Sequence, residues 1–389
     1  MERTQSPQSR WKPAVAAPIS FAEAMSAVAA QSVAILSSPI NQEEKCELSE
    51  ALGRVLASTV VADRDQPPFS RVTRDGFALR AQDLAGGTPL RVAGQLRAGE
   101  PWPATRPALA TGEAIEIMTG APLPPGTDAV LMVEHAREIS DENTDLVEGH
   151  FHSIVPCSGR TLVAGENVVQ RGSEARQGEI LLKPGTRLQT EEIALAASCG
   201  LRSVSVYPLP RVAILATGDE LVEPSNPDSK SDSTKTAIES HQIYDSNSHS
   251  LAALVRQAHA IPLRQPAVRD QKDELSAAIR QSLKVAPLLL LTGGVSMGRY
   301  DLVEEVLASL GAEFFFTGVK MQPGKPVVFG RVPASDGTPA RFFFGLPGNP
   351  VSTMVTFRVF VQPLLAAIAG EQPWQPRIAL AVLETEIKS

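Results

Sequence analysis

The sequence is poor in cysteine and in aromatic residues. Its three cysteines, Cys46, Cys157 and Cys199, lie far apart and form no Cys-x-x-Cys pair. This spacing disfavours a disulfide framework or a zinc knuckle, and it suits a reducing cytoplasm. Aromatic residues make up 5% of the 389 residues, whereas 31 prolines and 28 glycines are present. We therefore expect many turns and short strands, arranged in several domains.

Positive charge and long apolar runs are also scarce. The formal net charge of -7 argues against a nucleic-acid partner, although it leaves room for a small cationic pocket. No apolar run approaches the roughly 20 residues of a membrane helix, so no membrane partner is expected. Residues 1–18 lack the apolar centre of a signal peptide and are predicted to form a disordered tail. Together these features predict a cytoplasmic protein.

Residues 19–210 are predicted to hold a helix followed by a β-rich region. Ser20 and Glu23 form a capping box, and the apolar residues after them recur at helical spacing. From about Val55, short apolar runs alternate with Pro- and Gly-rich turns, which is typical of β structure. A second helix is expected at "TEEIALAASCG", with Thr190 as its cap and Gly200 as its stop.

Residues 211–370 alternate strand-like and helix-like segments. "RVAILA", "PLLLLT" and "RFFFGL" read as buried strands, and amphipathic or capped helical segments follow them. Asn349 is the predicted cap of the last helix, with Pro350 at its first position. This alternation predicts a parallel sheet with helices on both faces, a three-layer α/β/α domain.

Three loops directly follow predicted strands of that sheet: "ATGDEL", "LTGGVSMG" and "GLPGNP". Ligands bind at the carboxyl ends of parallel strands, and helix N-termini attract anions. The glycine loop fits neither GxGxxG nor a P-loop. Its glycines, Gly293, Gly294 and Gly298, would let backbone N–H groups approach a ligand closely. The alternative is that these loops are ordinary tight turns.

Carboxylates accompany these loops. Asp219 and Glu220 follow the first strand, Asp270 follows an arginine, and Asp301 closes the glycine loop. Carboxylates gathered at an anion site usually indicate a divalent cation that bridges them to phosphate. The alternatives are helix capping or a loop position for Asp270 and Asp301, and a solvated turn for Glu220.

Two lysines, Lys320 and Lys325, flank a Pro-Gly turn in "VKMQPGKPVVFG". Lysine acts as a compact point charge for phosphate or another oxyanion. The pair is therefore a candidate oxyanion site, and the alternative is two surface lysines on an edge strand.

The β-rich half contains further candidates. Asp75 and the glycine after it lie between apolar runs, and the alternative there is a simple hairpin. Thr119 precedes a Pro-rich loop and is otherwise explained as a turn residue. His150 and His152 resemble a metal pair, but no third ligand has suitable spacing, so we interpret them as exposed strand residues.

Seven motifs occur in one order: "RDGFALRAQDL", "IEIMTGAPLPPGTDAVLMVE", "AILATGDELV", "IYDSNSHSLAALV", "LTGGVSMGRYDLVEEVL", "VKMQPGKPVVFG" and "FFGLPGNPVSTMVTFRVFVQPLL". Together they resemble the molybdopterin molybdenumtransferase family, which includes the E domain of gephyrin. The resemblance runs from about Phe21 to Gly370. It implies an elongated, multi-domain chain with a molybdopterin-binding α/β/α domain, a β-rich N-terminal region and a C-terminal β domain.

The resemblance also implies an activity. Adenylylated molybdopterin and molybdate would give molybdenum cofactor and AMP, with Mg²⁺ as cofactor. The enzyme would be a homodimer with active sites built from both subunits, and a molybdopterin adenylyltransferase is a possible partner. The implied catalytic residues are Asp75, Thr119, Glu220, Asp270, Asp301, Lys320 and Lys325. Glu220 and Asp301 would bind the metal. The implied cofactor-binding residues are Gly293, Gly294, Ser296, Gly298, Gly348, Asn349 and Ser352.

The sequence departs from the family pattern in three places. The family usually has Asn-Ser-Ala-Met before Asp75, whereas residues 71–74 here are Arg-Val-Thr-Arg. The polar stretch "EPSNPDSKSDSTKTAIES" is longer than the usual link and is expected to be a mobile loop. Residues 371–389 are expected to be the start of a largely absent C-terminal β domain, so molybdate insertion by this chain should be weak while pterin binding and dimerisation persist.

Two other functions fit the same resemblance or chemistry less well. A non-catalytic pterin-binding or scaffold protein would need neither the acidic residues nor the lysine pair. A metal-dependent phosphoryl hydrolase would need a base to activate water, and no such base is evident in the sequence.

Overall fold

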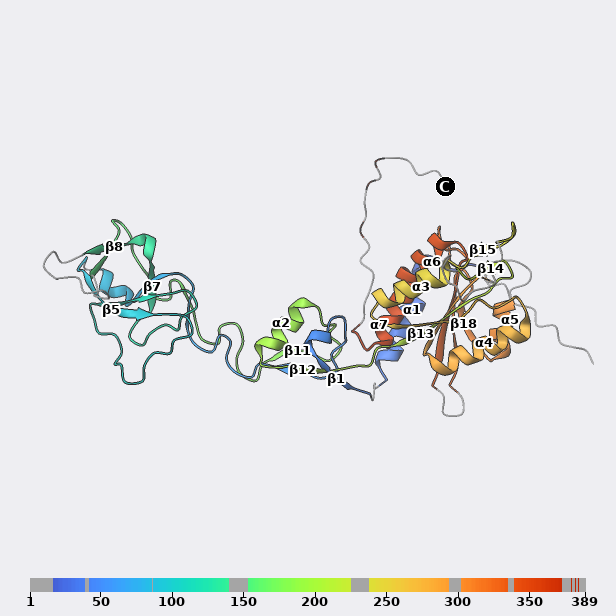
Figure 1. The fold of residues 1–389 in the computed structure, drawn as a ribbon, viewed down its shortest axis with the longest axis horizontal. Helices are drawn as coiled ribbons and strands as arrows, with labels where there is room; N and C mark the ends of the chain where they lie inside the picture. The colour runs from blue at the N-terminus through green and yellow to red at the C-terminus, as the bar shows by residue number, and fades with distance from the viewer. Residues whose placement is uncertain are drawn as a thin grey trace, which may run out of the picture. The chain divides into compact units, whose positions relative to one another are not determined.

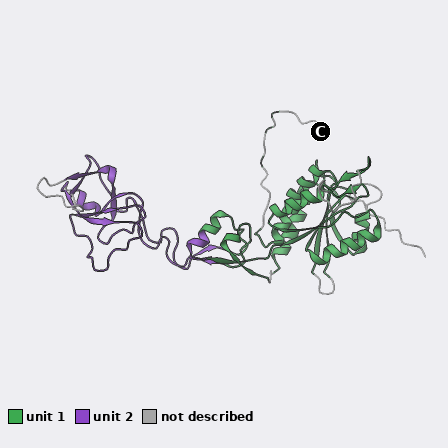
Figure 2. Cartoon of the chain, in the orientation of Figure 1, with its two compact units in different colours: residues 1–58, 183–194, 202–389 green, residues 59–182, 195–201 purple. Residues whose placement is uncertain are grey.

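The structure, a computed structural model, describes residues 17–38, 42–85, 87–139, 153–224, 238–293, 302–334 and 339–372, and the single residues 379, 382 and 384. These residues form two compact units (Figure 2). Unit 1 comprises residues 1–58, 183–194 and 202–389, and unit 2 comprises residues 59–182 and 195–201. The first predicted helix, assigned by sequence to the N-terminal region, lies in unit 1.

The main sheet of unit 1 has six strands among the described residues, in the order β16-β13-β17-β20-β19-β18. Their bounds are β13 Arg211–Ala216, β16 Ile261–Arg264, β17 Leu288–Thr292, β18 Glu313–Phe316, β19 Val328–Val332 and β20 Arg341–Leu346. The first four strands in the order are parallel, but β19 runs antiparallel to both β18 and β20. The prediction of a parallel sheet is therefore wrong for β19. A short connection without a crossover helix joins β18 to β19, and such a connection can only reverse the chain.

Helices cover both faces of this sheet (Figure 1). The helices on one face are α1 Phe21–Leu36, α3 Asn247–Gln257, α6 Pro350–Thr356 and α7 Gln362–Ile368, with a π-helical turn at Phe357–Val361 between the last two. Helices α4 Lys272–Val285 and α5 Leu302–Ser309 cover the other face. Val212 and Ile214 of β13 join the first core, whereas Ala213 and Leu215 join the second. This alternation explains the unbroken apolar strands, because both faces are buried.

Local capping signals set the ends of α1 and α6. Ser20 Oγ accepts a hydrogen bond from Glu23 N at 3.2 Å, and Glu23 Oε2 accepts one from Ser20 N at 2.7 Å, so the capping box is confirmed. Asn349 caps α6, as predicted, with Pro350 at its first position. Helix α1 packs against α7 and the sheet, with the rings of Phe21 and Phe360 6.0 Å apart.

The helical run Pro350–Ile368 corrects the expectation about apolar segments. It spans 19 residues at a mean hydropathy of 1.6, so by length and composition it could cross a membrane. It is the one such helix among the residues the structure describes, and 61% of it is buried within the molecule. Phe357, Phe360 and Leu364 from this run lie in the core of unit 1, which explains its apolar character without a membrane.

Two smaller sheets complete unit 1. Strand β1 Glu44–Glu47 pairs antiparallel with β12 Ser203–Val206, and a 3-10 turn at Leu48–Glu50 follows β1. Strands β14 Leu221–Val222 and β15 Ile243–Tyr244 form a parallel pair.

Helix α2 Thr190–Ser198 begins one residue earlier than the predicted cap at Thr190 implies. Thr190 is its first helical residue, and the carbonyl of Gln189 accepts the first helical hydrogen bond, from Ile193 N. Thr190 is therefore not the cap. Gly200 adopts a left-handed φ of 76°, and it ends the helix as predicted.

Unit 2 contains a six-stranded sheet in the described residues, ordered β7-β4-β6-β5-β9-β8. The bounds are β4 Gly76–Leu79, β5 Leu90–Leu96, β6 Glu113–Ile117, β7 Ala129–Met132, β8 Ala136–Ile139 and β9 Ser153–Pro156. Two short antiparallel pairs join β2 Val60–Val61 to β11 Ile180–Leu182, and β3 Arg71–Val72 to β10 Val168–Val169. Short 3-10 turns lie at Ala81–Leu84 and Val133–His135. The predicted β-rich region is confirmed, whereas His150 and His152 lie outside the described residues.

Candidate functional site

Four connections meet at one edge of the unit 1 sheet. Strands β13, β17 and β20 are parallel neighbours, with Ala216 opposite Thr292 and Thr292 opposite Leu346. The three predicted loops therefore leave the sheet at the same edge, as expected. Because β19 is antiparallel, its first residue Val328 pairs with Gly345 near the end of β20, which brings the lysine-bearing connection 317–327 to that edge as well.

The loop after β13 gathers two carboxylates around a buried threonine. Thr217 is 1% exposed, and its Oγ1 donates a hydrogen bond to Asp270 Oδ1 over 2.6 Å. Asp219 Oδ1 in turn accepts from Asp270 N over 3.3 Å. Asp219 and Asp270 are exposed side chains, so the structure places a pair of accessible carboxylates beside the end of β13. Asp270 is thus a loop residue that contacts the site, and the adjacent helix α4 begins two residues later.

Glu220 lies next to this pair along the chain. Its carboxylate folds over Gly218, at 2.7 Å from the position that a Cβ on Gly218 would take. Its predicted metal partner, Asp301, lies outside the described residues, as do Gly294, Ser296 and Gly298. Their roles therefore stay predictions. Within the described part of the chain, no group of three or more His, Cys, Asp or Glu side chains is arranged to hold a metal ion.

The loop after β20 is built by the cap of α6. Asn349 Oδ1 accepts hydrogen bonds from Val351 N at 3.0 Å and Ser352 N at 3.2 Å. This oxygen is therefore engaged in capping. Gly348 is exposed and Ser352 is nearly buried at 9% exposure, so Gly348 is the more accessible of these predicted cofactor-binding residues.

Asn247, at the start of α3, connects two of these loops. Its Nδ2 donates hydrogen bonds to Thr292 Oγ1 over 3.0 Å and to Gly348 O over 2.7 Å. Sequence reasoning assigned no chemistry to this residue. The signal was present in the "IYDSNSHS" motif, where an asparagine stands among small polar residues just before a helix.

The lysine-bearing connection is held by its backbone. Lys320 N donates to Ile19 O over 2.7 Å, and Val319 N donates to Lys325 O over 3.0 Å. Both lysine side chains are exposed. They are surface lysines, but both lie in the connection between β18 and β19, so the alternative that places them on an edge strand is wrong.

A second predicted pair lies in unit 2. Asp75 Oδ1 accepts hydrogen bonds from Thr119 N at 2.7 Å and from Thr119 Oγ1 at 2.8 Å. These bonds stabilise the carboxylate and lower the pKa of Asp75 below its ordinary value. The hairpin alternative for Asp75 is wrong, because β3 pairs with β10 while β4 pairs with β6 and β7. Thr119 does lie in a turn, closed by Ala121 N to Met118 O, and it also binds Asp75.

Arg71, in one of the stretches predicted to depart from the family pattern, has a local partner. Arg71 lies 3.8 Å from Glu174 in an exposed ion pair, which offsets part of the added positive charge. Exposed pairs of this kind contribute little to stability.

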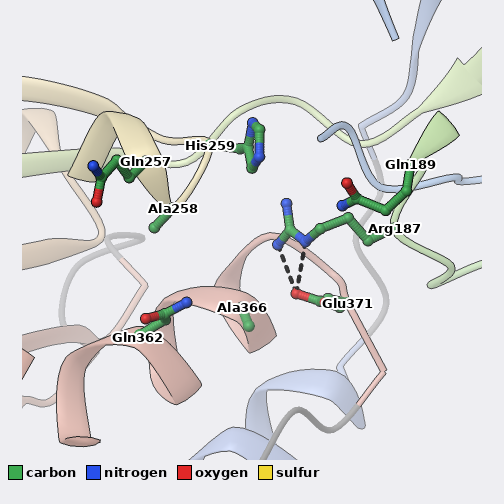
Figure 3. Close-up of a pocket in the computed structure, with 8 residues that line it drawn as sticks. All are labelled: Arg187, Gln189, Gln257, Ala258, His259, Gln362, Ala366 and Glu371. Atoms are coloured by element: carbon green, nitrogen blue, oxygen red, sulfur yellow. Dashed lines mark hydrogen bonds and ion pairs between the residues drawn. The ribbon is translucent and has the colours of Figure 1, made fainter. Parts of the chain in front are cut away.

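Unit 1 also contains a polar cavity of about 340 Å³ away from the predicted residues. Its lining residues are Arg187, Gln189, Gln257, Ala258, His259, Gln362, Ala366 and Glu371 (Figure 3). Arg187 donates through Nε and Nη2 to Glu371 Oε2, at 2.9 and 2.6 Å, and through Nη1 to Gly53 O. Burial lowers the pKa of His259, and the charge of Arg187 lowers it further. No predicted site residue lines this cavity.

Comparisons with known proteins identify the family of the chain. Residues 19–200 match the MoeA N-terminal region (domain I and II), and residues 213–367 match a probable molybdopterin binding domain. The chain is 33% identical over 334 residues to a molybdopterin molybdenumtransferase of Haemophilus influenzae, covering 86% of this chain and 75% of that protein. It is 35% identical over 339 residues to one of Nostoc, covering 86% and 71%.

A solved structure extends this similarity to the fold. The molybdopterin biosynthesis moeA protein from Pyrococcus horikoshii matches with a TM-score of 0.67 and 27% identity, over 92% of this chain and 80% of that chain. The resemblance predicted from the seven motifs is therefore confirmed. On these sequence and structural similarities, the chain belongs to the molybdopterin molybdenumtransferase family, a family of enzymes.

Proposed function

We propose that this protein inserts molybdate into adenylylated molybdopterin, releasing AMP and molybdenum cofactor. The observation that carries the proposal is the sharing of one sheet edge by the carboxylates after β13, the loops after β17 and β20, and the lysine-bearing connection. A dianionic diphosphate and an oxyanion are ligands that such an edge can hold, since parallel strands direct loops and helix N-termini toward it.

The lysines and the backbone groups at this edge are proposed to bind different parts of the substrates. Lys320 and Lys325 would receive the molybdate oxyanion as mobile point charges on an anchored backbone. The Gly348 backbone and the predicted glycine loop would hold the pterin and its diphosphate. Asp75, in unit 2, is a further proposed catalytic residue, and two hydrogen bonds from Thr119 hold its carboxylate.

The chemistry of the carboxylates fits the proposed Mg²⁺. This ion prefers oxygen ligands and commonly uses one or two carboxylates together with substrate phosphates, not a complete protein cage. Glu220, with Asp301, would hold it, and exposed Asp219 and Asp270 lie in the neighbouring loops. Once bound, it would supply positive charge that stabilises the diphosphate as its charge changes.

We also propose that the enzyme is a cytoplasmic homodimer that receives its pterin substrate from a molybdopterin adenylyltransferase. The resemblance of the chain to its family supports these points. Sedimentation of the purified chain would test the dimer independently of activity.

One assay separates the three candidate functions. The chain is incubated with adenylylated molybdopterin and Mg²⁺, with and without molybdate, and AMP is quantified by chromatography. The proposed function predicts AMP release that depends on molybdate. A hydrolase would release AMP without molybdate, and a scaffold protein would bind the pterin without releasing AMP; either result contradicts the proposal.

A further inference from the structure

The side chain of Asn247 joins two loops that are distant in the sequence. Its Nδ2 reaches Thr292, the last residue of β17, and Gly348, in the loop after β20. These partners lie 45 and 101 residues away along the chain. One amide therefore uses both of its N–H hydrogens to tie together the ends of two neighbouring parallel strands.

The partners also fix the orientation of the amide. A backbone carbonyl such as Gly348 O can only accept a hydrogen bond, so the nitrogen of Asn247, and not its oxygen, faces it. The oxygen then faces the other way. Asn247 Oδ1 is buried and has no hydrogen-bond partner among the described residues. Within the described part of the chain, Asn247 therefore acts as a donor, through its nitrogen, to Thr292 and to Gly348.

The start of α3 holds Asn247 in place. Asp245 is 1% exposed and accepts hydrogen bonds from both the backbone N and the Oγ of Ser248. Ser250 Oγ donates to Asn247 O over 3.0 Å. These hydrogen bonds restrain the backbone around Asn247. A restrained backbone allows the Asn247 side chain to hold its hydrogen-bond partners in place.

We propose that Asn247 is a positioning residue, whose amide nitrogen sets the separation between Thr292 at the end of β17 and Gly348 after β20, and so preorganises this part of the sheet edge for the pterin substrate. The identity of the substrate rests on the function proposed above. The connection that Asn247 makes between Thr292 and Gly348, here called the clamp, rests on its hydrogen bonds alone. Asn247 acts through the loops and not on the reacting atoms. Replacing Asn247 should weaken substrate binding more than it lowers kcat.

Two variants and one control test the clamp in the ligand-free chain. Asn247→Ala removes the amide, and Asn247→Asp keeps its shape but turns an oxygen toward the Gly348 carbonyl. Ser309→Ala, the control, removes a side-chain hydrogen bond to the carbonyl of Val306, a bond in which neither Asn247 nor its partners take part. Hydrogen exchange of peptides covering residues 288–293 and 342–349 should quicken in both Asn247 variants and not in Ser309→Ala. Unchanged exchange in both Asn247 variants would overturn the proposal, whether or not the chain is an active transferase.

Kinetics then test the link to the substrate. Both Asn247 variants should raise KM for adenylylated molybdopterin about tenfold, the effect of losing roughly one net hydrogen bond, with a smaller fall in kcat. Thr292→Val, which removes the side-chain acceptor, should raise KM too, and adding it to Asn247→Ala should have little further effect because the two share one interaction. Additive effects, or a wild-type KM in both Asn247 variants, would contradict the proposal. A wild-type chain that releases no AMP refutes the proposed function instead, and the exchange measurement still decides the clamp.

Discussion

The carbonyl oxygen of Thr217 lies 2.0 Å from the position that a Cβ atom on Gly293 would occupy. Thr217 N also donates to Thr292 O over 2.9 Å, so the backbones after β13 and β17 remain in contact beyond the sheet. Gly293 has a left-handed φ of 82°. Glycine is therefore required there for two separate reasons, its backbone conformation and the space that Thr217 takes.

These two reasons can be separated by a matched pair of substitutions. Gly311→Ala adds a Cβ at a similar φ of 76° into open space, so it should lower the free energy of unfolding by only about 1 kcal/mol. Gly293→Ala adds the collision with Thr217 and should cost about 3 kcal/mol. Urea unfolding of both variants measures this. Equal losses would mean that the backbone near Gly293 relaxes freely.

Removing the carboxylate charge of Glu220 should slow turnover more than it weakens pterin binding. Glu220→Gln keeps the shape of the side chain, and the loss of one electrostatic contact to a reacting group typically costs about 10²-fold in kcat. Glu313→Gln is the control, because exposed Glu313 begins β18 at the opposite end of the sheet and pairs with half-buried Arg331. Steady-state AMP release gives both constants. Equal kcat values for the two variants would remove Glu220 from the catalytic residues.

Asp301→Asn tests the partner predicted for Glu220. Asparagine can still cap a helix, so this variant should fold normally and yet lose activity if the carboxylate binds the metal. The Mg²⁺ concentration needed for half-maximal AMP release should rise. Full activity with an unchanged Mg²⁺ requirement would leave capping as the role of Asp301.

Lys325→Ala should raise the molybdate concentration needed for half-maximal activity more than any other single lysine substitution. The backbone of Lys325 is held by Val319, so the ammonium group is presented from a fixed point while it remains exposed. Pterin affinity should be unaffected. Lys284→Ala, at an exposed lysine in the last turn of α4, provides the control. An unchanged molybdate dependence in Lys325→Ala would refute the assignment.

The two hydrogen bonds from Thr119 to Asp75 predict a change in titration. Thr119→Val removes the hydroxyl donor but keeps the backbone donor, so the pKa of Asp75 should rise part of the way toward its ordinary value. Thr119→Ser keeps both donors and should leave the pKa unchanged. Carboxyl carbon NMR titration reads Asp75 directly. A pKa that is equal in the Val and Ser variants would show that the hydroxyl contributes nothing.

His259 should make the stability of unit 1 depend on pH. Its pKa in the folded chain is lowered by burial and by Arg187, so the folded state favours the neutral ring. The contribution is fully present above the unfolded pKa of about 6.5 and declines as the pH falls below that value, because the unfolded chain then takes up the proton more readily. His259→Asn suits the left-handed φ of 54° and should flatten this decline. Urea unfolding between pH 5 and pH 8 measures the free energy of unfolding. The same pH dependence in His259→Asn as in the unaltered chain would show that His259 is not its source.

Several features of the fold could be predicted from short stretches of sequence. The capping box at Ser20, the Asn349–Pro350 helix start and the glycine stop at Gly200 each depend on residues within a few positions of one another. The convergence of the three loops also followed, because strand–helix alternation constrains the direction of neighbouring strands. The seven ordered motifs were sufficient to predict the family.

The features of the fold and site that only the tertiary structure determined depend on contacts between residues that are distant along the chain. Pattern alone did not show that β19 runs antiparallel, that α1 packs on α7, or that Thr217 holds Asp270. It also gave no reason to single out Asn247, whose partners are 45 and 101 residues away. Local propensity and periodicity report the interactions of a residue with its near neighbours and the face that it buries. The pairing of distant polar groups is decided when the packed sheet brings strand ends together, because only then must each buried donor and acceptor find a partner.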